Sequence, residues 1–335
     1  MIKKRDYLWD NIKAILIFLV VLGHVLELCD RQIYPSIFMD KFIYMFHMPA
    51  FIFVSGFLAK SYCTNGKVRS IKVINLMAYY LIFQIIFFAI RIVIDHQTNF
   101  SILEPNRGLW YLLALIMYYL MIPVIEKLSP ILVIGLSIIF SLLVGVETKN
   151  IDNFMGIQRA IVFSPFFCIG YYLTSEKIEK LRSINIIVRI VVSIVITAVS
   201  SVTLYLMNDQ LKLSLFYGKS NYQELKYTVL QGFSLRALVI LMASSLIFVL
   251  ILILPSKKTF FSFIGKNSLQ IFILHMAIII TLITMKIKPT INGPLDIIAV
   301  IFVSLMSTVL LSFKVFEYPF DLIRKAVARI SNRYE

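Results

Sequence analysis

The chain has 335 residues, of which 59% are hydrophobic and 15% are charged, whereas soluble domains are typically about 45–50% apolar and about 25% charged. This composition excludes an ordinary soluble fold, because a soluble core could not hide so much apolar surface. The net charge of +15 falls mainly in short gaps between apolar runs, where it sets membrane orientation. Nucleic acid is therefore not an expected partner. The expected partner of these charges is the lipid bilayer with its anionic headgroups.

Apolar runs of about 17–25 residues recur along the chain, each long enough to cross the hydrocarbon core as a helix. In chain order the predicted spans are 11–29, 40–59, 72–95, 108–126, 130–147, 157–174, 184–207, 233–254, 267–286 and 294–316. We therefore predict an all-α, polytopic membrane protein of about ten transmembrane helices. Residues 1–335 are expected to form a single membrane domain with no appended soluble domain.

The distribution of Lys and Arg predicts the orientation of this helical bundle. When the N-terminus is assigned to the cytoplasm, the inside gaps hold about twice as many Lys and Arg residues as the outside gaps. Short cytoplasmic loops of membrane proteins carry such an excess. Both termini are therefore predicted to be cytoplasmic, which agrees with an even number of helices, and the protein is expected in the cell membrane.

The first predicted helix carries two ionisable residues on one stripe. Lys13 and His24 are eleven residues apart, which brings an α-helix almost back to the same face, and they lie ~16 Å apart along its axis. Ionisable side chains at membrane depth are costly, so each is a functional hypothesis. A cation near the inner mouth and a deeper base suit a long ligand with an anionic end. The alternative is a Lys that reaches the interface and a hydrogen-bonded core His.

The second predicted helix adds a histidine at a similar depth. His47 and His24 would lie at one level if the two helices are antiparallel neighbours. Pro49 is expected to disturb the helix, and Ser55 with Gly56 permits a close helix approach or a kink.

Two arginines near predicted helix ends and the three cysteines do not point to a specific site. Arg159 and Arg236 lie near predicted helix ends and are interpreted as interfacial anchors. The three cysteines show no paired spacing, and the intramembrane histidines lack the short spacing of metal ligands, so no metal site is predicted.

Several segments carry recognisable motifs in order. The first helix contains RDYLWDNIKAILIFLVVLGH, in which Asp10 and Lys13 precede His24, and the second contains FIYMFHMPAFIFVSGFLAK, with His47 and Ser55. LWYL, IGKNSLQIFILH and FEYP follow later in the chain. Over nearly its whole length the chain thus resembles the membrane acyltransferase-3 family, in its fucose 4-O-acetylase-like branch. The further matching positions are Arg69, Lys72, Trp110, Asn267, Ser268, His275 and Glu317.

Two positions depart from the commonest pattern of the family. Lys13 stands where Arg is commoner, and Lys72 is the second member of a basic pair that usually ends in Arg. The match of Lys72 to the family's basic position is therefore weaker than that of Arg69.

The resemblance implies transfer of an acyl group, usually acetyl, from cytoplasmic acyl-CoA to a hydroxyl of an extracytoplasmic carbohydrate. Acetyl-CoA is then the donor substrate, and no permanently bound cofactor is expected. His24 is the expected catalytic residue, as a general base or as an acyl carrier. His47 would orient the acceptor or stabilise the oxyanion, or it makes a structural hydrogen bond.

The remaining matching positions are expected to bind substrate, and for several of them a structural role is the alternative. Lys13, Arg69 and Lys72 are expected to bind the phosphates of CoA, unless they only set orientation. Trp110 would stack on a sugar or, as the preferred interpretation, anchor the membrane interface. The remaining candidate substrate-binding positions are Asp10, Ser55, Asn267, Ser268, His275 and Glu317, of which Asn267 and Ser268 alternatively cap a helix and Glu317 pairs with a cation.

Two other classes of function stay open at this stage. A transporter or flippase of a lipid-linked sugar or small anion would also keep buried charges, although no internal repeat typical of transporters is visible. A non-enzymatic scaffold would not need two histidines at one depth. The acceptor is equally open among fucose, another capsular or cell-wall sugar, and a lipid-linked intermediate.

Overall fold

The computed structural model describes residues 6–64, 67–96, 99–147 and 151–331, and these form a bundle of α-helices. The α-helices in chain order are α1 (Leu8–Leu28), α2 (Tyr34–Ala59), α3 (Ser70–Asp95), α4 (Trp110–Ile125), α5 (Pro130–Leu143), α6 (Ile157–Tyr172), α7 (Ser175–Arg182), α8 (Ile186–Leu206), α9 (Leu213–Tyr217), α10 (Val229–Ile253), α11 (Ser262–Lys266), α12 (Ser268–Thr284), α13 (Pro294–Leu311) and α14 (Tyr318–Ser331). Short 3₁₀ helices lie at η1 (Lys60–Tyr62), η2 (Arg107–Leu109), η3 (Val144–Val146), η4 (Ile151–Asn153) and η5 (Lys314–Glu317).

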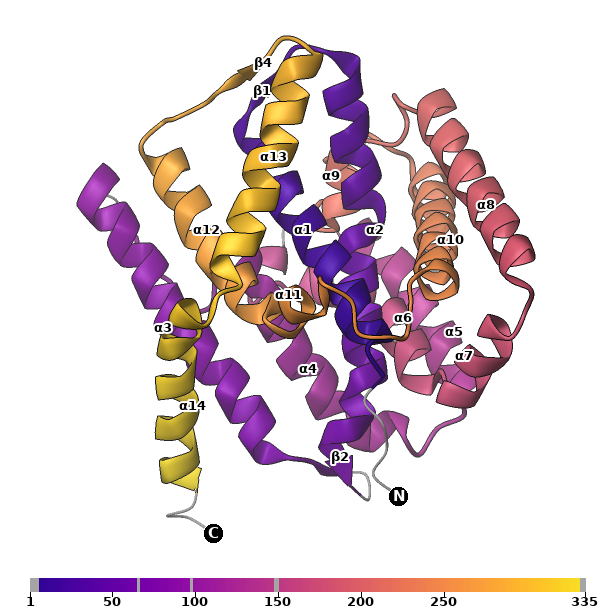
Figure 1. The fold of residues 1–335 in the computed structure, drawn as a ribbon, viewed down its shortest axis with the longest axis horizontal. Helices are drawn as coiled ribbons and strands as arrows, with labels where there is room; N and C mark the ends of the chain where they lie inside the picture. Colours follow the sequence, from indigo (N-terminus) through magenta and orange to yellow (C-terminus); the bar gives the residue numbers. More distant parts are fainter. Residues whose placement is uncertain (1–5, 65–66, 97–98, 148–150, 332–335) are drawn as a thin grey trace.

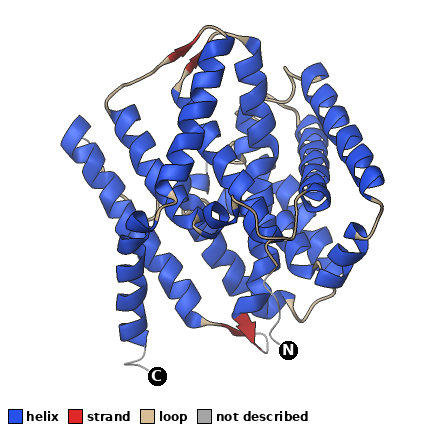
Figure 2. Ribbon diagram, viewed as in Figure 1, coloured by secondary structure: helices blue, strands red, loops and turns tan. Residues whose placement is uncertain are grey.

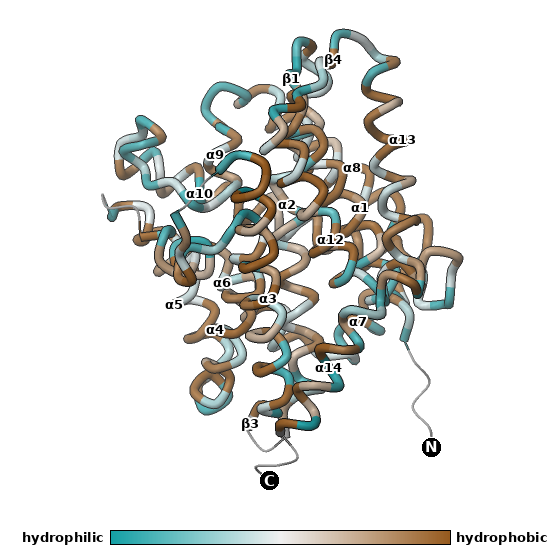
Figure 3. The backbone as a smooth tube through the Cα atoms, turned by 90° about the vertical axis from the view of Figure 1, so that its left-hand side faces the viewer, coloured by the Kyte–Doolittle hydropathy of each residue, from teal (hydrophilic) through white to brown (hydrophobic). Residues whose placement is uncertain are grey.

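Two very short strand pairs lie at opposite ends of the bundle (Figure 2). β1 (Asp30–Arg31) pairs in parallel with β4 (Thr290–Ile291), and β2 (Cys63–Thr64) pairs antiparallel with β3 (Lys67–Val68). Hydrophobic residues predominate along the helices, whereas hydrophilic residues gather in the connections (Figure 3). This distribution is that of a bundle whose solvent is a bilayer.

Each of the ten predicted spans overlaps a helix of the structure. Within the described residues, seven helical stretches are long and apolar enough to cross a membrane, and two more, 130–146 and 268–284, are apolar but shorter. The prediction of an all-α membrane protein is therefore confirmed. The count of ten spans and the cytoplasmic position of both termini stay predictions.

Local sequence signals begin several of these helices. Ser129 accepts a hydrogen bond from the backbone N–H of Leu132 and stands before Pro130 at the first position of α5. Thr228 and Gln231 form a reciprocal capping box at the start of α10. These caps satisfy backbone donors that the first helical turn leaves without partners.

Helix α1 lies inside the bundle, where it contacts α2, α11, α12 and α13 (Figure 1). Asn11 fixes its first turn: its amide donates to the carbonyl oxygens of Pro255 (2.7 Å) and Lys257 (3.1 Å). Its carbonyl oxygen accepts from the hydroxyls of Thr259 (2.6 Å) and Ser262 (2.7 Å). Because this buried amide is fully paired, it holds the depth of α1 relative to the chain before α11.

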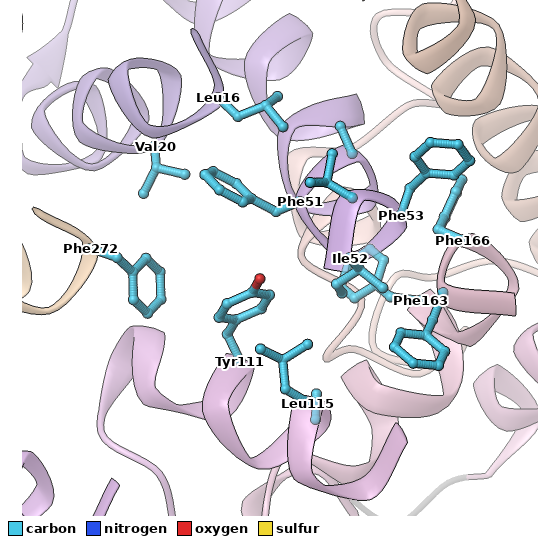
Figure 4. Packing of buried hydrophobic residues seen from close by; sticks show 14 of the residues in the cluster. Leu16, Val20, Phe51, Ile52, Phe53, Tyr111, Leu115, Phe163, Phe166 and Phe272 are labelled. Atoms are coloured by element: carbon cyan, nitrogen blue, oxygen red, sulfur yellow. The ribbon is translucent and has the colours of Figure 1, made fainter. Parts of the chain in front are cut away.

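The core around α1 is formed by large side chains from several helices. Figure 4 shows Leu16 and Val20 of α1 near Phe51 of α2, Tyr111 of α4 and Phe272 of α12. Leu16 is fully buried and Val20 is 1% exposed. This packing positions the polar side chains that project from the same helices.

Helices α2 and α6 approach each other through two glycines. A Cβ at Gly56 would lie 2.2 Å from the carbonyl oxygen of Phe167, and a Cβ at Gly170 would lie 2.1 Å from that of Phe53. The close approach predicted from Gly56 is therefore confirmed. Pro49 lies inside α2, which continues from Tyr34 to Ala59, so the disturbance expected there does not end the helix.

The interpretation of Arg236 as an interfacial anchor is wrong. Its side chain is 2% exposed, and its guanidinium donates to the carbonyl oxygens of Ser141 (3.1 Å) and Ser220 (3.4 Å). It also lies 4.7 Å from the ring centroid of Tyr222. The chain between α9 and α10 folds back over this helix end, which hydropathy along one helix does not reveal.

Candidate active site

Two adjoining cavities lie within the bundle. The first, called here the histidine cavity, has a volume of about 370 Å³ and is lined by residues that include His24 and His47. The second, called the lysine cavity, has a volume of about 270 Å³ and is lined by residues that include Lys13. Met48 and Phe272 line both cavities and therefore form the partition between them.

Three histidines from three helices gather beside the histidine cavity. The ring centroids of His24 and His275 are 5.3 Å apart in an edge-to-face arrangement. The ring of Tyr44 lies 6.2 Å from His24 and 4.8 Å from His47. His24 and His47 thus line one cavity, as their matched depths suggested, but the close imidazole neighbour of His24 is His275, which sequence spacing did not reveal.

Hydrogen bonds distinguish His24 from the other two histidines. The Nδ1 atoms of His47 and His275 lie 2.8 Å from the carbonyl oxygens of Ile43 and Ile271. Because a carbonyl only accepts, both rings donate from Nδ1. The Nδ1 of His24 and the Nε2 of His275 are buried without a hydrogen-bond partner among the described residues. His24, which is partly accessible, is therefore the imidazole that no backbone bond constrains.

A carboxylate network stands one turn beyond His24. Arg107 donates to Glu27 Oε1 (3.2 Å), and the hydroxyl of Tyr44 donates to Glu27 Oε2 (3.2 Å). Glu27 follows His24 by three residues and so shares its helix face. Burial raises the pKa of the Tyr217 phenol, which stays neutral and packs 4.8 Å from the Tyr44 ring. Arg107 was not predicted as a site residue from the sequence, although it lies two residues before the LWYL motif.

A wall of aromatic rings and one guanidinium lines another part of the histidine cavity. Trp110 is 6% exposed and stacks on Phe163 with 5.6 Å between ring centroids. The guanidinium of Arg159 lies 4.7 Å from the Trp110 ring and 2.7 Å from Asp152 Oδ2. Trp110 can present a flat face, and Arg159 and Asp152 can present hydrogen-bonding atoms, to a polar ring.

The interpretation of Trp110 and Arg159 as interfacial anchors is therefore wrong. Their helix ends are covered by chain segments from elsewhere in the sequence. The backbone N–H of Met155 donates to the carbonyl oxygen of Leu103 (2.6 Å), which joins the chain before α4 to the chain before α6. Gly156 adopts a positive φ of 67°, and a Cβ there would lie 2.9 Å from Trp110 Cβ, so the loop packs directly against the base of the Trp110 side chain.

The lysine cavity gathers four cations from distant parts of the chain: Lys13, Lys72, Lys266 and Arg324. Lys13 pairs with Asp10 at 3.0 Å, and the ammonium of Lys72 lies 4.2 Å from the ring centroid of Tyr62. Lys13 and Lys72 were predicted from the sequence, and Lys266 and Arg324 were not. Lys266 stands directly before Asn267 in the late motif, and that proximity was the available signal.

The other predicted site residues fall into three groups. Ser55 and Ser268 line the lysine cavity, where the Ser55 hydroxyl lies 2.8 Å from that of Tyr111. Arg69 is exposed before α3 and is not among the residues that line either cavity. Glu317 pairs with Arg324 at 3.1 Å, which confirms the predicted cation pair.

The alternative interpretation of Asn267, that its side chain caps a helix, is wrong. Asn267 occupies the N-cap position of α12, but its side chain makes no capping hydrogen bond. Its amide instead donates to the carbonyl oxygen of Ser312 at 2.8 Å. The side chain therefore links α12 to the end of α13, a long-range contact that the local motif does not encode.

Comparisons with known proteins agree with the motifs. The chain is 29% identical over 199 residues to the nodulation protein NolL of Sinorhizobium fredii, which covers 52% of this chain and 50% of that protein. It is 26% identical over 182 residues to the NolL protein of Mesorhizobium japonicum, with 50% and 47% covered. The chain thus spans about half the length of the curated relatives it matches. No solved structure matches it. The family model described as an acyltransferase domain matches residues 6–313, and the chain therefore belongs to the acyltransferase-3 family.

Proposed function

We propose that the chain is a membrane O-acyltransferase that moves an acyl group from acyl-CoA to a carbohydrate hydroxyl at the cell membrane. The acyl group is expected to be acetyl. The observation that carries the proposal is the pair of cavities divided by Met48 and Phe272. One is lined by four cations, and the other holds His24, whose Nδ1 has no hydrogen-bond partner in the described part of the chain. Membership of the acyltransferase-3 family supports the same reaction class.

The donor fits the lysine cavity. CoA carries several phosphates at one end, and Lys and Arg are the natural binders of phosphate. Under the predicted orientation, Lys13 and Lys72 lie toward the cytoplasm, where acyl-CoA is found. The ~16 Å axial separation between Lys13 and His24 would be spanned by the pantetheine arm, with the thioester reaching the partition at Met48 and Phe272.

The acceptor fits the histidine cavity. The Trp110 face suits the apolar side of a sugar ring, while Glu27, Arg107 and Asp152 offer charged acceptors and donors to its hydroxyls. Tyr217 adds a neutral phenol. A carbohydrate bound there would place a hydroxyl beside His24.

In the proposed reaction His24 acts as the general base. Its neutral imidazole takes the proton from the acceptor hydroxyl while that oxygen forms a bond to the thioester carbonyl carbon. The carbon–sulfur bond then breaks, and the CoA thiolate leaves and takes up the proton held by the imidazolium. His47, tied to Ile43 through Nδ1, would present Nε2 to orient the acceptor. The alternative of an acyl group carried on His24 is tested below.

The proposal is tested with protein reconstituted in liposomes and supplied with radiolabelled acetyl-CoA. The acceptor probes are a fucoside, an N-acetylglucosaminide and a glucoside. We expect an acetyl ester on at least one glycoside only when acetyl-CoA has access to the lysine-cavity side. Movement of a glycoside across the bilayer without esterification would instead favour the transporter and contradict the proposal.

Loss of cations in the lysine cavity should weaken donor binding specifically. Lys72→Gln and Lys266→Gln are each expected to raise the KM for acetyl-CoA about 10-fold to 100-fold, because one charge-assisted contact contributes about 1.5–3 kcal/mol, with kcat little changed. Steady-state kinetics check this. S-acetylpantetheine, which lacks the phosphates, should not distinguish the variants. Lys127→Gln, an exposed change outside both cavities, serves as the control.

A further inference from the structure

A third cavity lies between α3 and α12, at the end of the bundle that carries the histidine cavity. Its volume is about 170 Å³, and its lining includes Arg91 and Asp95 of α3, Lys286 after α12, and Arg107 of η2. It is called here the lateral cavity. Three cations face one carboxylate, so the cavity favours an anion.

Two of these cations have no directly bonded partner among the described residues. Neither the Arg91 guanidinium nor the Lys286 ammonium makes a hydrogen bond or an ion pair within that part of the chain, and Glu104 attracts Arg91 only from a longer distance. Arg91 is partly buried and is the only charge in the apolar stretch 85–94 of α3, and a charge in a membrane-spanning helix is costly unless it meets a partner. A bound anion would supply that partner.

The surroundings of the lateral cavity face lipid. Val93 on α3 is 77% exposed, Ile278 on α12 is 46% exposed and Met285 after α12 is 55% exposed. Exposed apolar side chains on a membrane helix contact the hydrocarbon chains of the bilayer. An anion that reaches Arg91 and Lys286 beside this surface is therefore best supplied by an amphiphile, with its phosphate among the cations and its hydrocarbon chain along α3 and α12.

The lateral cavity adjoins the candidate active site at Arg107. This residue lines both the lateral and the histidine cavities, and it pairs with Glu27 at 3.2 Å. Glu27 lies only ~4.5 Å along the α1 axis from His24. A group linked to an anion at Arg91 and Lys286 would therefore extend past Arg107 toward His24.

We propose that the lateral cavity binds the phosphate or diphosphate of a lipid-linked carbohydrate, which delivers its sugar sideways from the bilayer into the histidine cavity. The inference rests on the proposed function and names its acceptor class. Arg and Lys are suited to phosphate recognition at a membrane surface. The donor phosphates have a separate set of cations in the lysine cavity, so the lateral cations are not needed for CoA.

The first test measures binding without catalysis. Protein in phosphatidylcholine nanodiscs is titrated with farnesyl diphosphate, and bound ligand is counted by native mass spectrometry. Arg91→Gln and Lys286→Gln are each expected to weaken binding about 10-fold, because each removes one charge-assisted contact. Lys288→Gln is the matched control, since Lys288 is 64% exposed and outside the cavity. Unchanged binding in Lys286→Gln, an exposed position where the fold is not at risk, would overturn the proposal.

Competitors identify the source of the anion. Farnesol should bind at least 10-fold more weakly than farnesyl diphosphate, because it lacks the phosphates, and inorganic diphosphate should compete poorly because it lacks the chain. If phosphatidylglycerol displaces farnesyl diphosphate at equal concentration, the cavity is a general lipid-headgroup site and the proposal is overturned. Equal affinity for inorganic diphosphate would overturn it in the same way.

A second test separates this inference from the proposed function. Acetyl transfer is compared between a free glycoside and the same sugar on a prenyl diphosphate. Lys286→Gln should raise the KM about 10-fold for the lipid-linked acceptor and leave that for the free glycoside unchanged. Transfer to both acceptors with no effect of the variant would contradict the inference alone. Farnesyl diphosphate binding that depends on Arg91 and Lys286, without any acyl transfer, would contradict the proposed function alone.

Discussion

Replacement of His24 by asparagine should lower kcat for acetyl transfer about 100-fold to 10,000-fold, the usual contribution of a positioned general base. The KM for acetyl-CoA should change little, because the four cations that would hold its phosphates line the lysine cavity, where His24 does not lie. This split would show that His24 acts on the chemical step rather than on donor binding. Initial rates with labelled acetyl-CoA and the acceptor glycoside measure both parameters.

The matched control is His96→Asn. His96 is exposed at the end of α3 with a φ of 52°, and Asn tolerates this left-handed conformation. This variant should retain full activity. If the His24→Asn enzyme keeps more than about half of the wild-type kcat, His24 does not take part in the mechanism. Loss of a general base or of an acyl carrier would lower kcat far more.

The same protein distinguishes a general base from an acyl carrier. If His24 carries the acyl group, incubation with labelled acetyl-CoA and no acceptor should leave label on the protein, and His24→Asn should abolish it. If His24 is a general base, no protein-bound label should form. The Nδ1 of His24, which no described residue hydrogen-bonds, is compatible with either route, so this measurement decides between them.

Sequence periodicity predicted what lies on one helix and failed where distant segments meet. The eleven-residue spacing of Lys13 and His24 correctly placed both on a stripe that faces cavities, because helical geometry fixes the face and depth of a side chain. The contact of His24 with His275 depends on the packing of α1 against α12. No local pattern encodes that neighbour.

The errors at Trp110 and Arg159 have a related cause. Both residues stand near helix ends, where hydropathy alone predicts an interfacial position. The link between Met155 and Leu103 closes two loops over them, so they line a cavity instead. The cations Lys266 and Arg324 were missed for the same reason, since they join Lys13 only through the tertiary arrangement of α11, α14 and α1.

A large structural effect is expected from Gly56→Leu. A Cβ at this position would lie 2.2 Å from the Phe167 carbonyl oxygen, and backbone cannot move aside as a flexible side chain does. Helices α2 and α6 would have to separate, with a loss of at least ~1–3 kcal/mol from overpacking. Gly170→Leu should behave alike, because its Cβ would lie 2.1 Å from the Phe53 carbonyl oxygen. Thermal unfolding in detergent, followed by size-exclusion chromatography, measures the effect.

Gly135→Leu is the matched control, because a Cβ at Gly135 of α5 would meet nothing within 4 Å. It should unfold at the wild-type temperature or slightly above, since glycine inside a helix costs about 0.5–1 kcal/mol relative to alanine. Equal unfolding temperatures for the Gly56 and Gly135 variants would contradict the close α2–α6 contact. Because α2 also carries His47 and Met48, a shift of this helix would change both the histidine cavity and the partition. Any folded remainder of Gly56→Leu should therefore lose acyl transfer, while Gly135→Leu keeps it.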